Sequence, residues 1–256
     1  MSAQQPAKDS TRLVIPVAAV IALAIMGDSL MYSLLPLQAE RLGFSLAGVG
    51  LLLSANRIIR LLSNTWAGLA FERFGSKAPF IFAAVLSVLT TWLYGAGMGF
   101  AVFFLARAGW GVAWSILRQG GFVAVWAAGS NRKGRLMGSL WGMVRVGSAV
   151  SVLLGGYLYD RFGFSTAVSA ITVVTLFAIP GAMLIRWPHN HFAGTSQARS
   201  PLAGLREGLA NSPRRWLLVV GFLYTFMEAL IAVTLSKYIQ LNYGDTITSL
   251  GVGIGI

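Results

Sequence analysis

The 256-residue sequence contains no cysteine and few charged residues. Only 11% of the residues are charged and 56% are hydrophobic, whereas soluble domains carry about 25% charged residues. The lack of cysteine excludes disulfide bonds and thiolate metal sites. Acidic residues are the scarcest charged type, with 8 Asp and Glu against 20 Lys and Arg. This composition predicts a membrane protein and argues against a soluble domain.

Groups suited to metal binding or catalysis are also scarce. The two histidines, His189 and His191, lie together in one polar segment, whereas a complete zinc site takes three or four ligands. No nucleophile with a neighbouring base can be recognised. We therefore expect no metal, no cofactor and no enzymatic activity. The basic residues are spread between apolar runs, which argues against nucleic acid as a partner.

Long apolar runs divide the chain into segments able to cross a bilayer as helices. Six of them occupy residues 13–37, 45–69, 78–97, 100–128, 136–159 and 165–187. They predict an all-α polytopic fold with a six-helix bundle over residues 13–187. A polar tail (1–12) precedes this bundle, and a polar, arginine-containing loop (188–215) follows it. Residues 216–256 begin a second, incomplete bundle with a further apolar run.

The positions of Lys and Arg predict how the protein lies in the membrane. They gather in residues 1–12 and in every second connection, including 188–215, whereas the alternate connections hold only Arg41, Arg161 and Lys237. Cytoplasmic loops carry the excess of Lys and Arg. We therefore expect a multi-pass protein of the cell membrane, with the N-terminus and the 188–215 loop on the cytoplasmic side.

The sequence also repeats itself. The stretch Gly68-Leu-Ala-Phe-Glu-Arg-Phe-Gly75 returns 88 residues later as Gly156-Tyr-Leu-Tyr-Asp-Arg-Phe-Gly163, and Arg57 matches Arg145 at the same offset. Each unit holds three helices, so the second unit enters the membrane from the opposite side. Inverted three-helix repeats are typical of transporters, because two related states can open to either side. A weaker repeat about 200 residues long predicts a natural protein of roughly 400 residues.

The repeated stretch resembles motif A of the major facilitator superfamily, which joins the second and third helices. The matching residues are Gly68, Glu72, Arg73, Gly75 and Lys77. Glu72 stands where the family usually has aspartate, and Ser76 where it has a basic residue. Arg107 and Gly111 resemble motif B on the fourth helix. Residues 147–156 match the antiporter motif C only in part. The resemblance implies a helix bundle that transports solutes, with Glu72 and Arg73 in a cytoplasmic latch.

Two charged residues inside apolar runs are candidates for proton coupling. Asp28 lies roughly 20 Å along the first helix, and Arg107 lies about 10 Å from the outer end of the fourth. A carboxylate at such depth faces the bundle interior and pairs with a cation. In one interpretation Asp28 accepts a proton when Arg107 moves away. In the other, the two form a static ion pair that fixes helix packing.

A polar face on the second helix predicts a solute cavity. Asn56, Arg57, Arg60 and Asn64 share this face, and Arg145 is the repeat partner of Arg57. The other cavity candidates are Glu228, Trp110 and Trp114. Arginine can bind a carboxylate or phosphate through two hydrogen bonds, so the excess of positive charge suggests an acidic substrate. Alternatively, Arg57 and Arg60 extend to the membrane surface or bond to carbonyl groups.

We therefore expect secondary active transport of a small solute, coupled to protons, with export of a drug or metabolite favoured. Uptake of an organic anion or other nutrient is the alternative within this class. A truncated scaffold or binding subunit that transports nothing is the alternative outside it. The expected partners are the lipid bilayer, protons and a small-molecule substrate, and the protein is expected to be monomeric.

Overall fold

The computed structural model describes residues 6–39, 41–128 and 132–188, and only separate positions between residues 210 and 242. Within the three continuous ranges the chain is helical and contains no strand, as the apolar runs predict. The helices are α1 (Pro6–Ala24), α2 (Met26–Gln38), α3 (Leu46–Phe74), α4 (Lys77–Gly95), α5 (Phe100–Ala127), α6 (Lys133–Phe162), α7 (Phe164–Leu176) and α8 (Ala178–Leu184).

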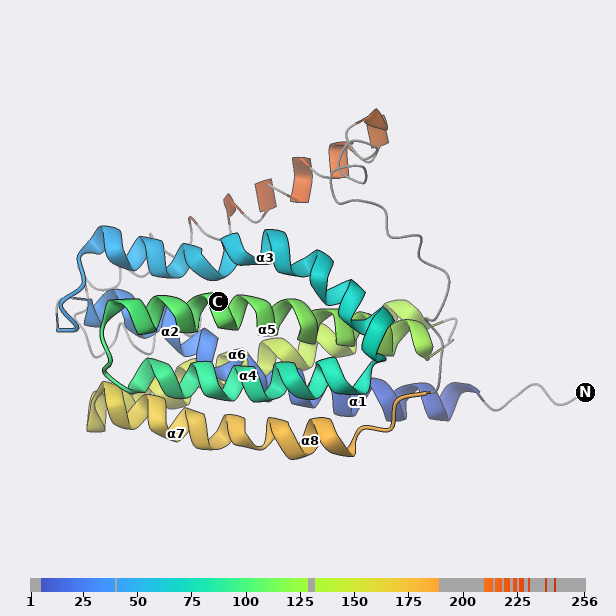
Figure 1. Ribbon diagram of the computed structural model, residues 1–256, viewed down its shortest axis with the longest axis horizontal. Helices are drawn as coiled ribbons and strands as arrows, with labels where there is room; N and C mark the ends of the chain where they lie inside the picture. The colour runs from blue at the N-terminus through green and yellow to red at the C-terminus, as the bar shows by residue number, and fades with distance from the viewer. Residues whose placement is uncertain are drawn as a thin grey trace, which may run out of the picture.

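The helices run back and forth side by side, with short turns at the two ends of the bundle (Figure 1). Five spans in the described ranges are long and apolar enough to cross a membrane: Arg12–Pro36, Lys77–Gly95, Phe100–Ala127, Lys133–Phe162 and Phe164–Leu184. Helix α3 is as long as these but is not among them. It lies along α5, and it carries Asn56, Arg57, Arg60 and Asn64, which lower its hydropathy.

Two of the expected helices are each broken once. The first is interrupted at Ile25, between α1 and α2, although the backbone hydrogen bonds Ile25 N–Ile21 O and Ser29 N–Ile25 O continue across the break at 3.0 Å. The sixth is interrupted at Phe177, between α7 and α8. Pro180 explains the second break, because proline lacks an N–H and its ring collides with the carbonyl four residues earlier.

The two repeated stretches are helical for most of their length, although the apolar run predicted the second helix to end near residue 69. Helix α3 continues to Phe74, and only Gly75 and Ser76 make the turn. Gly75 has φ of 72°, a backbone conformation open mainly to glycine. In the second copy α6 continues to Phe162, and Gly163 makes the turn with φ of 82°.

The packing of the helices follows the inverted repeat. The first unit comprises α1–α2, α3 and α4, and the second comprises α5, α6 and α7–α8. The middle helix of each unit packs against the first helix of the other, α3 against α5 and α6 against α1–α2, and the third helices, α4 and α7–α8, pack against each other. An inverted repeat predicts this reciprocal arrangement.

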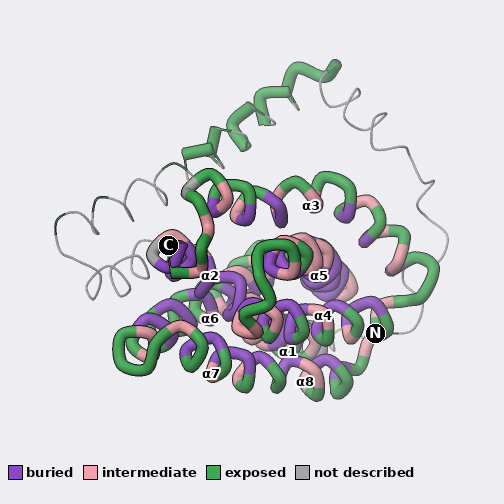
Figure 2. The backbone as a smooth tube through the Cα atoms, turned by 60° about the vertical axis from the view of Figure 1, so that its left-hand side comes forward, coloured by how far each residue is buried: buried purple, intermediate pink, exposed green. Residues whose placement is uncertain are grey.

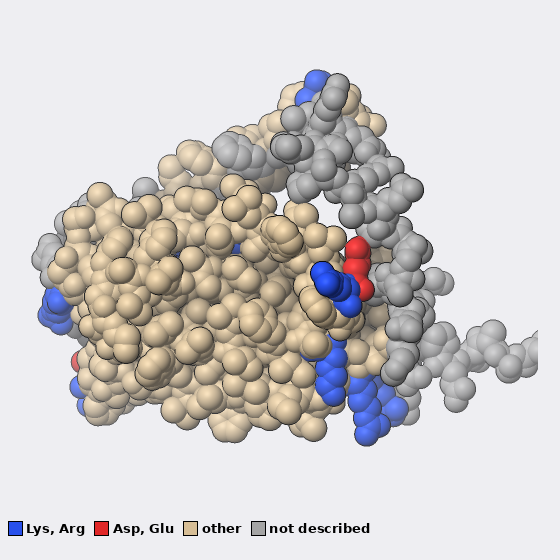
Figure 3. Space-filling view, viewed as in Figure 1, with Lys and Arg blue, Asp and Glu red and all other residues tan. Residues whose placement is uncertain are grey.

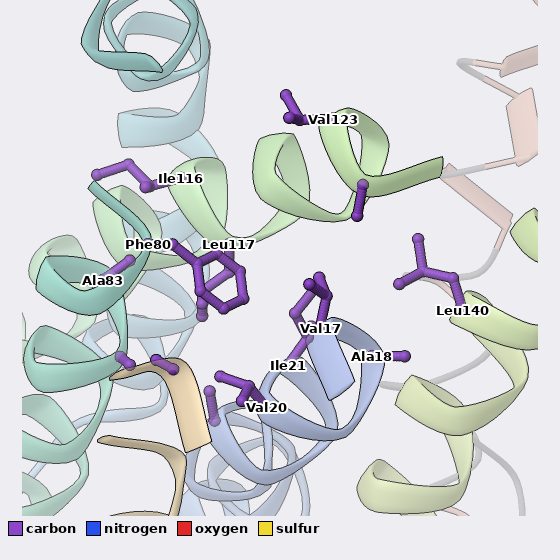
Figure 4. Packing of buried hydrophobic residues seen from close by; sticks show 14 of the residues in the cluster. Val17, Ala18, Val20, Ile21, Phe80, Ala83, Ile116, Leu117, Val123 and Leu140 are labelled. Carbon is purple, nitrogen blue, oxygen red and sulfur yellow. The ribbon is translucent and has the colours of Figure 1, made fainter. Parts of the chain in front are cut away.

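The core lies where α1, α4, α5 and α6 meet. Figure 4 shows Val17 and Ile21 of α1 together with Phe80 of α4 and Leu117 of α5, all of them buried. The outer faces of the helices are exposed along their length, most clearly on α3 (Figure 2). These faces are apolar: Leu61 and Trp66 of α3 are 77% and 70% exposed. Such surface suits contact with lipid or with further helices.

Charged side chains gather at the two ends of the bundle, and the broad middle shows almost none (Figure 3). On the face shown, the end where α1 begins and where the α3–α4 and α5–α6 turns lie carries more Lys and Arg than the opposite end does. A surface with few charges between charged ends is the distribution expected of a membrane-spanning bundle.

Small residues allow α6 to lie close to α1 and α2. A Cβ atom on Gly147 would lie 2.9 Å from the carbonyl carbon of Ala22. On the same face of α6, the Ser151 hydroxyl donates to the Met26 carbonyl. Gly138 and Gly142 differ from Gly147, because a Cβ atom there would meet no atom of the described chain within 4 Å.

The close contact at Gly147 and its absence at Gly138 predict that a glycine-to-alanine substitution changes the stability of the protein differently at these two positions of α6. Gly147→Ala should lower the free energy of unfolding by about 1–3 kcal/mol, because α6 must move away from α1. Gly138→Ala should be neutral or stabilising, because alanine favours a helix over glycine. Thermal melting of the detergent-solubilised full-length protein measures both. Equal melting temperatures for the two variants would contradict the close approach at Gly147.

Candidate functional site

An ion pair lies inside the bundle, formed by the two residues singled out for proton coupling. The Arg107 Nη1 atom on α5 contacts the Asp28 Oδ1 atom on α2. The Arg107 residue is fully buried and Asp28 is 4% exposed. A charge held in such surroundings needs a partner, because removing it from water costs several kcal/mol.

The Arg107 guanidinium is held from several sides. Its Nε donates to the backbone carbonyl of Leu52 on α3 at 3.2 Å. The ring centroids of Tyr32 and Tyr94 lie 5.0 and 5.9 Å from its Cζ atom, within the range of cation–π attraction. Only one of the two Nη atoms bonds to Asp28. The other, Nη2, makes no hydrogen bond with the described part of the chain.

Asn56 connects the ion pair to α3. Its Nδ2 donates to Asp28 Oδ1 at 3.2 Å, and its Oδ1 accepts from the Tyr32 hydroxyl at 3.3 Å. This geometry depends on Gly111, because a Cβ atom there would lie 2.6 Å from the Asn56 carbonyl oxygen. Gly111 thus allows α5 to approach α3 at the level of the ion pair. The motif B residues Arg107 and Gly111 therefore act on neighbouring parts of one site.

A cavity of about 560 Å³ opens beside the ion pair. Its size falls within the usual range for small-molecule sites. It is lined by Ile25, Asp28, Ser29, Tyr32, Arg57, Arg60, Leu61, Trp114, Arg118, Phe122, Trp141, Val144, Arg145 and Ser148. Asp28 is therefore reached from the cavity, whereas Arg107 lies behind it and is absent from this lining.

The structure brings together half of the predicted cavity residues. Arg57, Arg60, Arg145 and Trp114 line the cavity. Trp110 does not, which corrects that expectation: it is 1% exposed and packs in the core cluster, one helical turn nearer to Arg107.

The remaining cavity candidates lie outside the lining. Asn56 is buried behind it, and Asn64 is exposed and accepts a hydrogen bond from Arg118 at 3.0 Å. Glu228, like His189 and His191, lies outside the described residues.

The sequence interpretation missed several cavity residues, of which Arg118 matters most. Arg107, Gly111, Trp114 and Arg118 are spaced by four, three and four residues, so they share one face of α5. This spacing would have pointed to Arg118. Tyr32 is likewise one turn beyond Asp28 on α2. Ser148, one turn beyond Arg145 on α6, hydrogen-bonds to Ser29 of α2 and joins these two helices at the cavity wall.

The motif A residues lie far along the bundle from the ion pair, at the α3–α4 turn. Glu72, Arg73 and Lys77 are exposed, and within the described ranges Glu72 forms no ion pair. A Cβ atom on Gly68 would meet no described atom within 4 Å, so Gly68 makes no close helix contact in this part of the chain.

A buried carboxylate and a cavity of small-molecule size share one wall in this bundle. Asp28 is the only acidic residue among the described lining residues, and no cluster of His, Asp and Glu in the described ranges is suited to metal binding. The arrangement offers proton exchange at one carboxylate and electrostatic contacts from arginine side chains.

Comparison with known proteins agrees with this architecture. The family model of the Major Facilitator Superfamily matches residues 17–256. The chain is 24% identical over 161 residues to the chromaffin granule amine transporter of Rattus norvegicus, a match covering 62% of this chain and 31% of the relative.

Two solved structures share the fold. A structure of a proton-dependent oligopeptide transporter matches with a TM-score of 0.64 and 16% identity, over 90% of this chain and 54% of the other. A crystal structure of tetrameric PepTSo2 matches with a TM-score of 0.61 and 18% identity, over 93% of this chain and 50% of the other. The chain thus spans about half the length of these structures. Because the family model matches nearly the whole chain, the chain belongs to the major facilitator superfamily.

Proposed function

We propose that the protein is a proton-coupled secondary transporter of a small solute, with Asp28 as the proton site. One observation carries this proposal: Asp28 lies on the cavity wall while its partner Arg107 is fully buried behind it. A proton or a solute entering the cavity therefore reaches the carboxylate directly. Ionisable groups inside membrane bundles usually mark ion and substrate paths.

Protonation of Asp28 changes the stability of the ion pair. The neutral carboxyl group no longer balances Arg107, which is left with the Leu52 carbonyl and the Tyr32 and Tyr94 rings. An uncompensated buried charge costs several kcal/mol. This cost favours a rearrangement of α2 against α5. Two arrangements of one bundle, biased by a proton, are the basis of alternating access.

The break at Ile25 provides a place for such movement. It lies three residues before Asp28, and the small residue Gly27 packs closely against Thr91 of α4. Breaks in membrane helices are common at binding sites of transporters. In this proposal the α2 segment that carries Asp28 shifts relative to α1 at Ile25, and its contact with Thr91 shifts with it.

We further propose that the protein lies in the cell membrane as a monomer, with its N-terminus in the cytoplasm. The greater share of Lys and Arg at the end with the N-terminus supports this orientation (Figure 3). Motif A would then lie on the cytoplasmic side, where Glu72 and Arg73 are available to a latch partner outside the described residues. Export of a drug or metabolite is the favoured direction of transport.

Asp28→Asn should abolish proton-coupled transport. The amide keeps the shape of the side chain and its hydrogen bond with Asn56, but it cannot take up a proton. The full-length protein in everted membrane vesicles, with an imposed proton gradient, should dissipate the gradient when its substrate is added. The variant should not do so, while solute exchange without a gradient persists.

Asp160→Asn is the matched control, because Asp160 is exposed in the last turn of α6, at the opposite end of the bundle from motif A. It should retain coupled transport. Gradient-driven transport by Asp28→Asn at the level of the unchanged protein would refute Asp28 as the proton site. No transport by the folded, inserted protein with any compound would favour a scaffold or binding subunit instead.

A second prediction separates coupling from a purely structural ion pair. Asp28→Asn and Arg107→Gln should each destabilise the protein by up to about 3–5 kcal/mol, since each leaves the other member of the pair buried without its partner. The double variant should regain much of this loss, as thermal melting in detergent would show. It should nevertheless fail to couple transport to protons. A double variant that regained both properties would mean that the pair only holds α2 to α5.

A further inference from the structure

Among the described residues that line the cavity, positive charges outnumber negative ones. Four arginines line it, namely Arg57, Arg60, Arg118 and Arg145, from the three helices α3, α5 and α6. The only acidic residue in the described lining is Asp28, and Asp28 is already bonded to Arg107. Positive charges inside a membrane bundle are costly unless opposite charges or polar groups accompany them.

Three of these arginines have neutral partners. Arg57 lies over the ring of Tyr32, with its Cζ atom 5.8 Å from the ring centroid, and Arg60 lies over Trp114 at 5.4 Å. Arg118 donates to the amide oxygen of Asn64. Within the described residues none of the three forms an ion pair. The Nε atom of Arg60 is buried and makes no hydrogen bond there.

Three aromatic side chains lie beside these guanidinium groups in the cavity lining. The rings of Trp114 and Trp141 lie with centroids 6.1 Å apart, and Trp141 and Phe122 lie 6.2 Å apart. All three residues line the cavity. Trp114 connects the two features, because its ring also contacts Arg60. One side of the cavity therefore suits a negative group and the adjoining side suits a flat apolar body.

We propose that the cavity binds an amphipathic organic anion, with its acidic group on Arg57, Arg60 and Arg118 and an aromatic ring against Trp114 and Trp141. This inference rests on the proposed function, since it names the substrate class of the same cavity. A carboxylate, sulfonate or phosphate offers the planar or clustered oxygens that guanidinium groups bind in pairs. The available volume, about 560 Å³, accommodates a molecule with one or two rings.

This substrate class differs from the amines named in the rat relative. An ammonium ion would meet several arginines and, among the described lining residues, would have only Asp28 to bind, in competition with Arg107. Like-charge contacts of this kind oppose binding by several kcal/mol in closely packed sites. The cavity arginines therefore favour anions over cations.

Binding of matched aromatic probes tests the proposal. The probes are 2-naphthoate and 2-naphthylmethylamine, which share a ring system and differ in the sign of their charge. Isothermal titration calorimetry on the full-length protein in phosphatidylcholine nanodiscs measures both. We expect 2-naphthoate to bind at least about tenfold more tightly than the amine. Arg60→Gln should weaken naphthoate binding about tenfold or more, because a charge-assisted hydrogen bond is lost.

Two further variants keep the test decisive. Arg186→Gln removes an exposed arginine beyond α8, outside the cavity, and should leave binding unchanged. If Arg60→Gln does not fold, Arg60→Lys keeps the charge and should still weaken binding, because an ammonium group cannot form two parallel hydrogen bonds. Tighter binding of the amine, or equal naphthoate binding by the unchanged protein and the folded Arg60 variant, would overturn the proposal.

The acidic group that binds the cavity arginines could also be the headgroup of an anionic lipid. Nanodiscs with and without an anionic lipid distinguish this source from a soluble anion. Naphthoate binding that persists in discs containing phosphatidylglycerol supports a soluble anion, and its loss there would contradict one. Binding requires neither a gradient nor transport. If transport is coupled to protons but naphthoate does not bind, only the proposed substrate class is refuted. If naphthoate binds but Asp28→Asn still transports with the proton gradient, only the proposed role of Asp28 in coupling is refuted.

Discussion

The burial of the Arg107 charge in an apolar bundle is the constraint on which this structure depends. A guanidinium out of contact with water must find its partners within the protein. Here they come from three helices: Asp28 and Tyr32 of α2, the Leu52 carbonyl of α3, and Tyr94 of α4. Each of these helices must approach α5 closely. The contacts that stabilise the Arg107 charge thus hold α2, α3 and α4 against α5.

Small residues make that approach possible and place the cavity. Gly111 lets α5 meet α3 at Asn56, and Gly147 and Ser151 let α6 meet α1 and α2. The cavity occupies the space that these contacts leave between α2, α3, α5 and α6. Its described wall combines one carboxylate with arginines and tryptophans. In the proposed function the proton site and the solute site are therefore neighbours, and a change at one would alter the electrostatic environment of the other.

Much of this architecture could be predicted from the sequence, because apolar runs and membrane helices coincide. The Asp28–Arg107 contact followed from the same logic: two opposite charges at similar depth have few other partners. The spacing of residues along the sequence was less informative about which side chains reach the cavity and where helices end or break. Trp110 and Trp114 share a helix face, yet only Trp114 reaches the cavity. The helical course of residues 68–74 and the break at Ile25 were not predicted, because the end of an apolar run does not set the end of a helix and a continuous apolar run does not show an internal break.

The central claim is that Asp28 exchanges its proton as the transporter works. Infrared difference spectroscopy of the full-length protein in lipid observes this directly, because the C=O stretch of a protonated carboxyl group is distinct from that of a carboxylate. Substrate addition at constant pH should change this band in the unchanged protein and not in Asp28→Asn. The same band change in both proteins would show that another carboxyl group carries the proton, and would contradict the account.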